Sequence, residues 1–375
     1  MGLNTKKYLK TWVEISEKAL LNNLSIFKKL SKGQKFMAVI KSNAYGHGML
    51  KIAKLIQNKV DYFGVDSVRE GLELRKEKIK TPILVLGPTI PTQIAFAIRN
   101  NLEISISSLD QLQNVLFLKN KQILRIHIKV DTGMGRQGFL FWEDKKLIEV
   151  LKNLPKHIKL VGLYGHLASG DTKRGERQTK KQITEYKEWV SLFKKNKFNL
   201  TTHLCATSGV LNHQDGEFDM VRVGIGLYGI WPSNYLKNKL SDKFKLEPVL
   251  KWKTVLTEIK ILEKGSCVGY GCLEKLSKTL KIGICPVGYW HGFPRNFSTR
   301  AYVLINNQKA KVLGAVSMDM IAVDLSMIKN PKPMDEVLIM GGGVQQITNF
   351  NNLEEKLGQS AYELSTRINP LIYRL

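Results

Sequence analysis

Short apolar runs alternate with amphipathic segments along the first 230 residues of the chain. The runs are rich in β-branched residues, and several are almost continuously apolar, as the strands of a buried parallel sheet are. They cover residues 36–41, 61–65, 81–87, 103–108, 125–130, 159–168, 199–207 and 220–229. Eight strands separated by helices predict an α/β domain of the (β/α)₈ barrel type. An open, doubly wound parallel sheet is the structural alternative.

Helix signals occur between the runs. Ser16 is a candidate N-cap, and Ser67 with Glu70, like Ser108 with Gln111, has the spacing of a capping box. We therefore expect helices to begin after these three serines.

The pattern changes after about residue 243. Alternating apolar and polar stretches are joined by turns rich in Asn, Gly and Lys, among them Asn306-Asn307, which is typical of an antiparallel β domain with hairpins. A last helix is expected from about Leu353 to Thr366. We expect two domains, residues 1–243 and 244–375, with residues 1–14 as a candidate to pair with the second.

The composition excludes several classes of protein. With 43% hydrophobic and 9% aromatic residues, the chain can bury a substantial core, which excludes a mainly disordered protein. No apolar run approaches the roughly 20 residues of a membrane-spanning helix. The cysteines at 205, 267, 272 and 285 form no CxxC pair and have no clustered histidines, which argues against a disulfide framework or a structural zinc site. We expect a cytoplasmic protein without a bound metal.

The formal net charge of +26 raises the question of a nucleic-acid partner. The basic stretches are short and scattered, lysine predominates over arginine, and no basic stripe is interleaved with aromatic residues. A lysine-rich solvated surface accounts for the charge, so we expect no nucleic-acid partner.

The ends of the first and eighth runs carry the candidate chemistry, because a barrel collects its catalytic residues at the C-terminal ends of its strands. Lys41 ends the first run. A lysine that leaves a buried strand is costly to desolvate unless its pKa falls or its amine is bonded, and both conditions suit Schiff-base chemistry. A strand-end lysine with a solvated amine is the plainer alternative.

Glycines in the eighth run, Gly224 and Gly226, have backbone N–H groups that can reach a phosphate. This spacing alone is a weak signal, because glycines also serve tight turns. Together with Lys41 it predicts pyridoxal 5'-phosphate as a cofactor, with its aldehyde on Lys41 and its phosphate near Ser208 and Gly224.

Five segments resemble the alanine racemase family, in the family's order and over essentially the whole chain. They are TWVEI at 11–15, VIKSNAYGHG at 39–48, VDTGMGRQGF at 130–139, RVGIGLYG at 222–229 and VSMDM at 316–320. The resemblance implies a pyridoxal-phosphate barrel followed by a β domain, in a homodimer whose active sites are shared between chains. It implies that L-alanine and D-alanine are interconverted by two bases on a pyridoxal-phosphate imine, supplying D-alanine for peptidoglycan. The alternatives are a racemase of another or of several amino acids, such as serine, and a non-catalytic pyridoxal-phosphate carrier.

The resemblance also implies catalytic roles for single residues. Lys41 matches the family's Schiff-base lysine, and Tyr270 matches the opposite base, which comes from the partner subunit. Racemization needs a base on each face of the α-carbon, but a phenol with a pKa of about 10 is a poor base, so His166 is the implied hydrogen-bond donor to it. Arg222 matches the arginine that faces the pyridine nitrogen. Since arginine is always protonated, it makes the ring a weaker electron sink and favours racemization over decarboxylation.

Further residues match cofactor and substrate contacts of the family. The phosphate-binding positions are Tyr45, Ser208, Gly224, Ile225 and Tyr362. Arg136 and the backbone of Met318 match groups near the substrate carboxylate and the cofactor's phenolic oxygen. Lys129 matches a lysine that is often N-carboxylated in the family and braces Arg136.

Some positions depart from the family pattern. Thr207 stands where the family usually has Asn before the phosphate-binding serine. His203 lies five residues before Ser208, one more than in the family pattern, so the resemblance implies no role for it. Ala315 stands where an arginine normally lines the substrate corridor with an acid and a second arginine, here Asp171 and Arg295. A positive corridor affects access more than proton transfer. The resemblance therefore implies the chemistry of racemization but does not imply strict selectivity for alanine.

Overall fold

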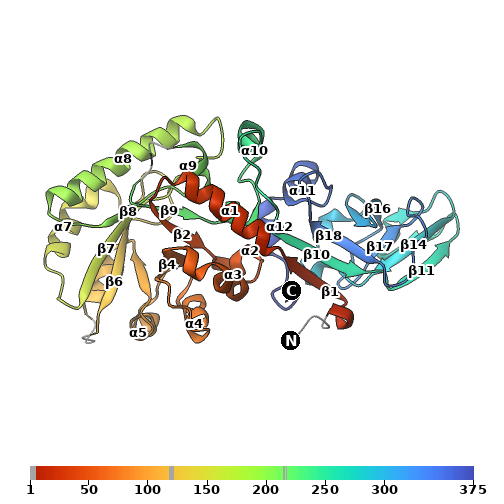
Figure 1. Cartoon of the computed structure of the whole chain (residues 1–375), viewed down its shortest axis with the longest axis horizontal. Helices are drawn as coiled ribbons and strands as arrows, with labels where there is room; N and C mark the ends of the chain where they lie inside the picture. Colours follow the sequence, from red (N-terminus) through yellow and green to blue (C-terminus); the bar gives the residue numbers. More distant parts are fainter. Residues whose placement is uncertain (1–5, 118–121, 214–215, 217) are drawn as a thin grey trace.

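Two β-sheets organise the computed structural model, which describes residues 6–117, 122–213, 216 and 218–375. In Figure 1 one sheet is surrounded by helices, and the other lies beside it at the right of the view. The first sheet has eight strands and the second has nine.

The eight-stranded sheet is built from the eight apolar runs that predicted strands. Its members are β2 (Lys35–Val39), β3 (Tyr62–Val65), β4 (Ile83–Pro88), β5 (Glu103–Ile106), β6 (Leu124–Lys129), β7 (Ile158–Tyr164), β8 (Thr201–His203) and β9 (Met220–Val223). They are parallel neighbours in chain order, and β9 returns to pair with β2. Asp219 N donates to Thr202 O at 2.9 Å and Arg222 N donates to Cys205 O at 3.0 Å, which brings β9 against β8. The predicted barrel is confirmed, and the open doubly wound sheet is wrong.

Helices connect the strands and cover the outside of the barrel (Figure 1). They are α1 (Glu17–Leu30), α3 (Met49–Ile56), α4 (Val68–Lys76), α5 (Pro91–Arg99), α6 (Leu109–Leu116), α7 (Asp144–Lys152), α8 (Glu176–Lys195), α9 (Thr207–Asn212) and α10 (Asn234–Leu240). The segment labelled α2 (Lys41–Tyr45), after β2, is a left-handed turn. The three predicted N-caps are confirmed. The hydroxyls of Ser16, Ser67 and Ser108 accept from the backbone N–H three residues later, at 3.2 or 3.3 Å.

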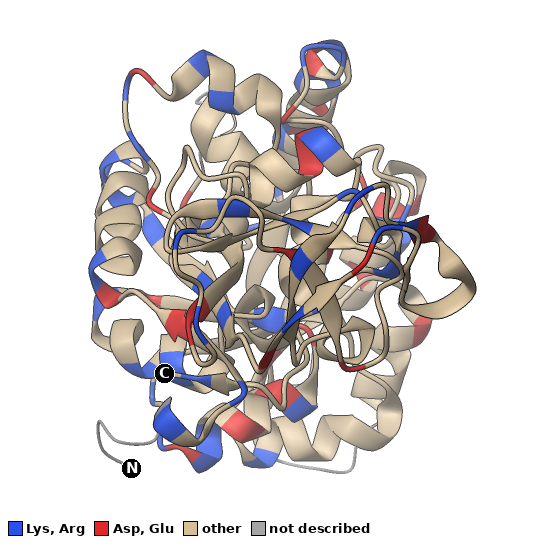
Figure 2. Cartoon of the chain, turned by 90° about the vertical axis from the view of Figure 1, so that its right-hand side faces the viewer, with Lys and Arg blue, Asp and Glu red and all other residues tan. Residues whose placement is uncertain are grey.

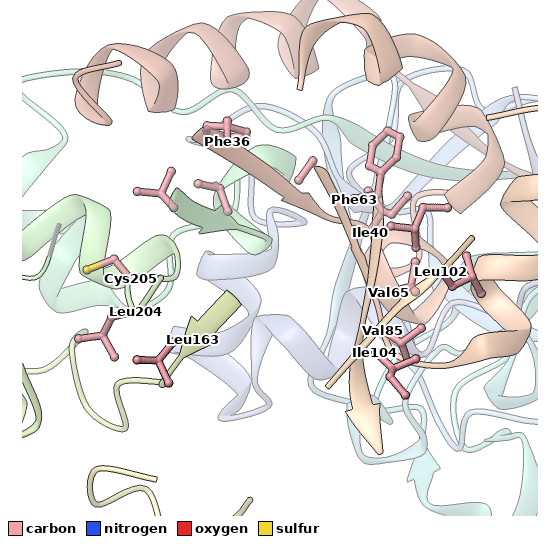
Figure 3. Packing of buried hydrophobic residues seen from close by; sticks show 14 of the residues in the cluster. Phe36, Ile40, Phe63, Val65, Val85, Leu102, Ile104, Leu163, Leu204 and Cys205 are labelled. Atoms are coloured by element: carbon pink, nitrogen blue, oxygen red, sulfur yellow. The ribbon is translucent and has the colours of Figure 1, made fainter. Parts of the chain in front are cut away.

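Alternation along the strands separates an apolar outside from a polar inside. On β6, Ile126 and Ile128 join the large cluster between strands and helices, whereas the buried His127 and Lys129 alternate with them. Figure 3 shows part of this cluster, from successive strands and their ends: Ile40, Val65, Val85 and Ile104. Buried polar side chains need partners, so the inner face of the barrel is where a site is to be sought.

The second sheet is mostly antiparallel, as predicted. Its strands, in spatial order, are β11 (Glu258–Leu262), β14 (Leu280–Cys285), β17 (Ile321–Asp324), β16 (Gln308–Leu313), β15 (Tyr302–Ile305), β18 (Glu336–Gly341), β10 (Leu250–Val255), β1 (Thr11–Ile15) and β19 (Tyr373–Arg374). The N-terminal strand β1 pairs antiparallel with β10. Asn306 and Asn307 have φ of 51° and 61° between β15 and β16, so the predicted hairpin is confirmed. The domain boundary predicted at residue 243 falls between α10 and β10 and stays a prediction.

The last predicted helix is wrong in one respect. The segment forms two helices, α11 (Phe350–Leu357) and α12 (Ala361–Thr366), rather than one. Gly358 takes φ of 74° and ends α11 in a left-handed cap, which separates the two.

A small ladder outside the two large sheets, β12 (Cys267–Val268) with β13 (Glu274–Lys275), encloses the short 3-10 helix η6 (Tyr270–Cys272). Contrary to the expectation from cysteine spacing, Cys267 and Cys272 form a disulfide here, because the tight loop brings their Cα atoms to 4.9 Å.

Three further observations concern partners. Within the described ranges, no three His, Cys, Asp or Glu side chains form a group that could hold a metal ion. No helix in the same part of the chain is long and apolar enough to span a bilayer. Figure 2 shows Lys and Arg scattered among Asp and Glu over many elements in that view, rather than gathered into one stripe.

Candidate active site

A cavity of about 770 Å³ lies at the C-terminal ends of the barrel strands. It is walled by Lys41 after β2, Lys129 at the end of β6 and Arg222 on β9. The predicted site residues that line it are Lys41, Tyr45, Lys129, Arg136, His166, Ser208, Arg222, Gly224, Ile225 and Tyr362. The fold thus brings together residues that are far apart in the sequence.

Two predicted site residues do not line this cavity. Tyr270, on η6, has a side chain that is 74% exposed. Met318 is 52% exposed, and its carbonyl oxygen accepts from the backbone N–H of Trp290 at 3.0 Å. Both belong to the part of the chain around the second sheet. One chain therefore holds the candidate lysine in its cavity and the candidate tyrosine on its surface.

Lys41 begins a left-handed turn. The residues from Ser42 to Tyr45 all have φ between 52° and 55°, a conformation that costs L-residues about 1–2 kcal/mol each. The Glu70 carboxylate, on α4, supports the turn by accepting from the backbone N–H groups of Ser42 and Asp66, both at 2.7 Å. The Asp66 carboxylate lies 3.5 Å from Lys41 Nζ. The amine therefore reaches the cavity from a strained backbone that side chains hold in place.

The end of this turn is attached to the C-terminal strand. Gly46 has φ of 86°, and a Cβ there would collide with the carbonyl oxygen of Ser365, so only glycine fits. Arg374, on β19, donates from Nε and Nη2 to the Gly46 carbonyl oxygen at 3.1 and 3.0 Å. The second sheet thus supports the loop that carries Lys41.

Arg222 is only 3% exposed and bonds through both arms of its guanidinium. Nη1 donates to Nδ1 of His203 at 2.8 Å, and Nη2 donates to Nδ1 of His166 at 3.3 Å and to the Gly165 carbonyl oxygen at 2.7 Å. A guanidinium cannot accept a hydrogen bond, so both rings accept through Nδ1 and carry their proton on Nε2. Arg222 therefore fixes the tautomer of two histidines.

A buried chain of hydrogen bonds continues from His203 into the barrel. His203 Nε2 donates to Nδ1 of His127 at 3.1 Å, and His127 Nε2 donates to Glu103 Oε2 at 2.8 Å. Burial, followed by the neighbouring Arg222 and His127, lowers the pKa of His203 well below its usual range. Gly162 makes room for this arrangement, since a Cβ there would overlap the His127 ring. This series of hydrogen bonds connects the buried guanidinium of Arg222 to the buried carboxylate of Glu103.

Sequence reasoning missed Glu103, His127, His203 and Asp66. The alternation Arg-Ile-His-Ile-Lys on β6 puts His127 on the same face as Lys129, which was a usable signal. No comparable signal pairs Glu103 with a histidine, because the partners come from different strands.

Asp131 shapes the loop that carries Arg136. Its Oδ1 accepts from the backbone N–H groups of Gly133, Met134 and Gly135 at 2.9, 2.7 and 3.2 Å, and its Oδ2 accepts from that of Arg136 at 2.9 Å. Burial alone would raise the pKa of Asp131, but these four donors outweigh it and hold the pKa below its ordinary value. An ionised Asp131 thus fixes the backbone from which Arg136 reaches the cavity.

Lys129 is 5% exposed, and its amine donates to Oε1 of Gln137 at 3.1 Å. Burial, followed by the charges of Arg136 and Arg222, lowers the pKa of Lys129 to about 8. A part of the amine is therefore uncharged near neutral pH. Among the described residues, the buried Nε2 of Gln137 finds no acceptor. One buried amide donor beside Lys129 is thus left without a partner among the described residues.

Small residues form another part of the cavity wall. A Cβ at Gly224 would lie 2.5 Å from Oη of Tyr45, so a larger residue would displace the tyrosine. Burial raises the pKa of Tyr45 to about 12, so its hydroxyl keeps its proton and can donate a hydrogen bond. Thr207 Oγ1 accepts from the backbone N–H groups of Gly224 and Gly226 at 3.2 and 3.4 Å. Ser208, Ile225 and Tyr362 also line the cavity. The hydroxyls of this wall have the chemistry of a phosphate cradle, and the N–H of Gly224 can join them by exchanging its long bond to Thr207 Oγ1 for a phosphate oxygen.

Family models match nearly all of the chain. "Alanine racemase, N-terminal domain" matches residues 15–232, and "Alanine racemase, C-terminal domain" matches residues 249–375.

Individual proteins resemble the chain over its whole length. The alanine racemase of Clostridium novyi is 34% identical over 97% of this chain and 94% of its own. That of a Synechocystis species is 33% identical over 95% of each. The solved structure of alanine racemase from Clostridium difficile 630 superposes with a TM-score of 0.91 at 31% identity, covering 98% of this chain and 95% of that one.

Proposed function

Because the chain belongs to the alanine racemase family, we propose that it interconverts L-alanine and D-alanine with pyridoxal 5'-phosphate, in a homodimer with shared active sites. The observation that carries the proposal is the meeting of Lys41 and the buried Arg222 in one cavity whose wall includes the cradle at Gly224. A non-catalytic carrier would need neither the second sheet nor Tyr270, so the observations favour the enzyme.

The residues of the cavity fit the proposed cofactor. Its phosphate would be held by the hydroxyls and backbone groups of Tyr45, Ser208, Gly224, Ile225 and Tyr362, its aldehyde by Lys41 and its ring nitrogen by Arg222. The fit rests on the cradle, which a side chain at position 224 would fill. When bound, the cofactor supplies an electron sink that makes the α-proton of the substrate acidic.

Arg222 limits how strong that sink becomes. Its guanidinium donates on both arms and has no proton acceptor to offer, so it disfavours a proton on the ring nitrogen. Less negative charge is then drawn from the α-carbon. This supports reversible proton exchange over decarboxylation or transamination.

Two bases exchange the α-proton from opposite faces. The Lys41 amine acts from within its own cavity, and the Tyr270 phenol of the second chain acts from the other side. An exposed Tyr270 that does not line its own chain's cavity supports this division.

His166 prepares the phenol for this role. Burial, followed by the charges of Arg222 and Arg136, lowers the pKa of His166 to about 3, so the ring is neutral. Since Nδ1 accepts from Arg222, Nε2–H is left to donate to a phenolate. A hydrogen bond to the charged form of a group lowers its pKa, which makes Tyr270 a better base.

Arg136 binds the substrate carboxylate, and the Met318 backbone completes that contact from the second chain. We include N-carboxylation of Lys129 in the proposal. An uncharged amine is the form that adds carbon dioxide, and a pKa of about 8 supplies it. The new C–N bond forms as the amine nitrogen releases one proton to solvent. The resulting anion would accept from Arg136 and from the unsatisfied Nε2 of Gln137.

A wider substrate range is the second candidate function. Ala315 presents a methyl group where the family resemblance implies an arginine, and its backbone lies against Gly269, next to Tyr270. A smaller side chain here favours the entry of larger amino acids such as serine.

A cytoplasmic location and the supply of D-alanine for peptidoglycan also belong to this proposal and rest on the family resemblance. The activity is tested by circular dichroism of L-alanine and L-serine solutions incubated with the purified protein. Loss of the alanine signal is expected, and borohydride-treated protein should carry a pyridoxyl group on Lys41. No racemization of any amino acid, or a label on another lysine, would contradict the proposal.

A further inference from the structure

A disulfide closes the loop that carries Tyr270. Cys267 and Cys272 are joined across four intervening residues, and both cysteines are exposed. The other two cysteines, Cys205 and Cys285, are buried thiols. In the single chain, the exposed pair of cysteines is therefore the oxidised one, and it brackets the candidate base.

The flanks of this loop are anchored, but little besides the disulfide holds the residues between them. Strands β12 and β13 pair through Cys267 with Lys275 and Val268 with Glu274, and the Glu274 carboxylate accepts from Lys311 Nζ and from the backbone N–H of Gly314. Across residues 267–272, all of which the structure describes, Val268 is the one buried side chain. Gly269, Gly271 and Cys272 have φ of 70°, 68° and 48°, so the backbone follows an irregular path. A cross-link within such a segment removes alternative conformations that its few contacts would allow.

We propose that Cys267 and Cys272 form a redox site that controls the position of Tyr270. With the disulfide formed, the phenol is held where it can reach the partner chain's cavity, and with the disulfide reduced the loop moves and turnover falls. The inference rests on the proposed function of Tyr270 as a base. It also gives the pair a use in a reducing compartment, where disulfides are usually transient or redox-sensing.

The reaction at this site is thiol–disulfide exchange with a dithiol, either a small molecule or a protein with paired cysteines. One thiolate of the reductant attacks an exposed sulfur, the S–S bond breaks, and a mixed disulfide forms. The second thiolate of the reductant displaces the remaining sulfur. Overall, two electrons and two protons pass to Cys267 and Cys272, and the dithiol becomes a disulfide. Cys285 does not compete, because burial raises the pKa of its thiol and few thiolates form there.

The expected effect is on turnover rather than on substrate affinity. Proton transfer depends steeply on the placement of the base, whereas Arg136 holds the substrate carboxylate from a different loop. We expect reduction to lower kcat by about tenfold and to change KM for alanine by less than about twofold.

The test compares cofactor-loaded enzyme in its oxidised state with the same enzyme after treatment with dithiothreitol. Alkylation and peptide mapping report the state of Cys267 and Cys272, and the rate of chymotrypsin cleavage after Tyr270 reports the freedom of the loop without reference to activity. The double variant Cys267→Ser/Cys272→Ser should have the low kcat of the reduced enzyme and no response to dithiothreitol. The variant Cys285→Ala should respond as the parent does.

The outcomes separate this inference from the proposed function. A kcat that is unchanged after complete reduction, or a cleavage rate that does not rise, overturns the redox role. A fall in kcat that also occurs in the double variant overturns it too, because the reagent is then acting elsewhere. Absence of racemization in both redox states, with the cofactor bound, instead contradicts the proposed function itself.

Discussion

Arg222 donates a hydrogen bond to Nδ1 of His203 over 2.8 Å, inside the barrel and out of contact with solvent. This hydrogen bond sets the direction of each following hydrogen bond in the buried series from His203 to Glu103. His203 must donate through Nε2 to His127, which must donate to the Glu103 carboxylate. This series of hydrogen bonds thus keeps the Arg222 guanidinium charged and fixed in position, with the Glu103 carboxylate as its distant counter-charge.

Replacing His203 by leucine should damage this arrangement severely. The change conserves volume but leaves Nη1 of Arg222 without its ring acceptor and His127 without its donor. Since an unsatisfied buried charged donor costs about 2–3 kcal/mol, we expect a loss of that size in the free energy of unfolding. Urea denaturation measures it. Glu103→Gln is the matched control, because an amide oxygen can still accept from His127, and its loss should stay below about 1 kcal/mol. Equal losses in the two variants would contradict the proposed direction of the bonds.

The buried histidines should make the protein sensitive to acid. The pKa of His166 is lowered to about 3 by burial and by Arg222, and that of His47 is lowered to about 3, mainly by burial. Between about pH 6.5 and pH 3 such a ring binds a proton in the unfolded chain but not in the folded one. The free energy of unfolding therefore falls as the pH falls through this window, by about 2 kcal/mol per ring at pH 5.

Denaturation of the parent and of His166→Asn at pH 8, 7 and 5 tests this sign. From pH 7 to pH 5 the variant should lose about 1–2 kcal/mol less than the parent, and from pH 8 to pH 7 the two should change alike. A parent protein that is more stable at pH 5 would show that the histidines are already protonated when folded.

The strained turn after Lys41 predicts a role for Glu70 in cofactor binding. Its carboxylate accepts from Ser42 N and Asp66 N, so Glu70→Ala should release the left-handed turn and misplace the lysine. We expect the Kd for pyridoxal 5'-phosphate, measured by titration of its absorbance, to rise about tenfold, or about 1.4 kcal/mol. Glu70→Gln keeps an acceptor oxygen of the same reach and should have a much smaller effect. An unchanged Kd in Glu70→Ala would mean that the turn is stable without this support.

A large side chain in place of Ala315 is predicted to change the selectivity between alanine and serine as substrates. Ala315→Arg should raise kcat/KM for alanine relative to serine, because the added volume narrows access beside Tyr270. Effects of one group on selectivity range from about 10- to 200-fold, and the lower end is expected for a corridor position. Ala315→Leu adds volume without charge and separates the two causes. Unchanged ratios in both variants would mean that position 315 has no influence on substrate choice.

Local patterns in the sequence predicted most of the fold, whereas most residues in the wall of the cavity were predicted from the resemblance to the alanine racemase family. The eight apolar runs and the serine caps depend on neighbours within one element, so they are visible in the chain. The alternation on β6 likewise carried a signal for His127 and Lys129 on the inner face.

What could not be predicted depends on contacts between distant segments. Glu70 supports the turn after Lys41 across 28 positions, and Arg374 binds Gly46 across 328. These two contacts follow from the closed barrel and the sheet beside it, and periodicity within one segment does not contain them. The disulfide between Cys267 and Cys272 is local by contrast, but it depends on the path of an irregular loop rather than on a spacing motif.

Subunit exchange between two inactive variants tests the shared active site most directly. Lys41→Ala removes the proposed base in the chain's own cavity, and Tyr270→Phe removes the proposed base that it offers to its partner. In a mixed dimer one site has both bases and the other has neither, so an equal mixture should regain up to about a quarter of the parent's racemase activity. The measurement is the rate of L-alanine racemization after exchange, with the mixed dimer identified by mass spectrometry. Recovery supports a site built from two chains, whereas no activity in a mixture shown to contain mixed dimers would contradict it.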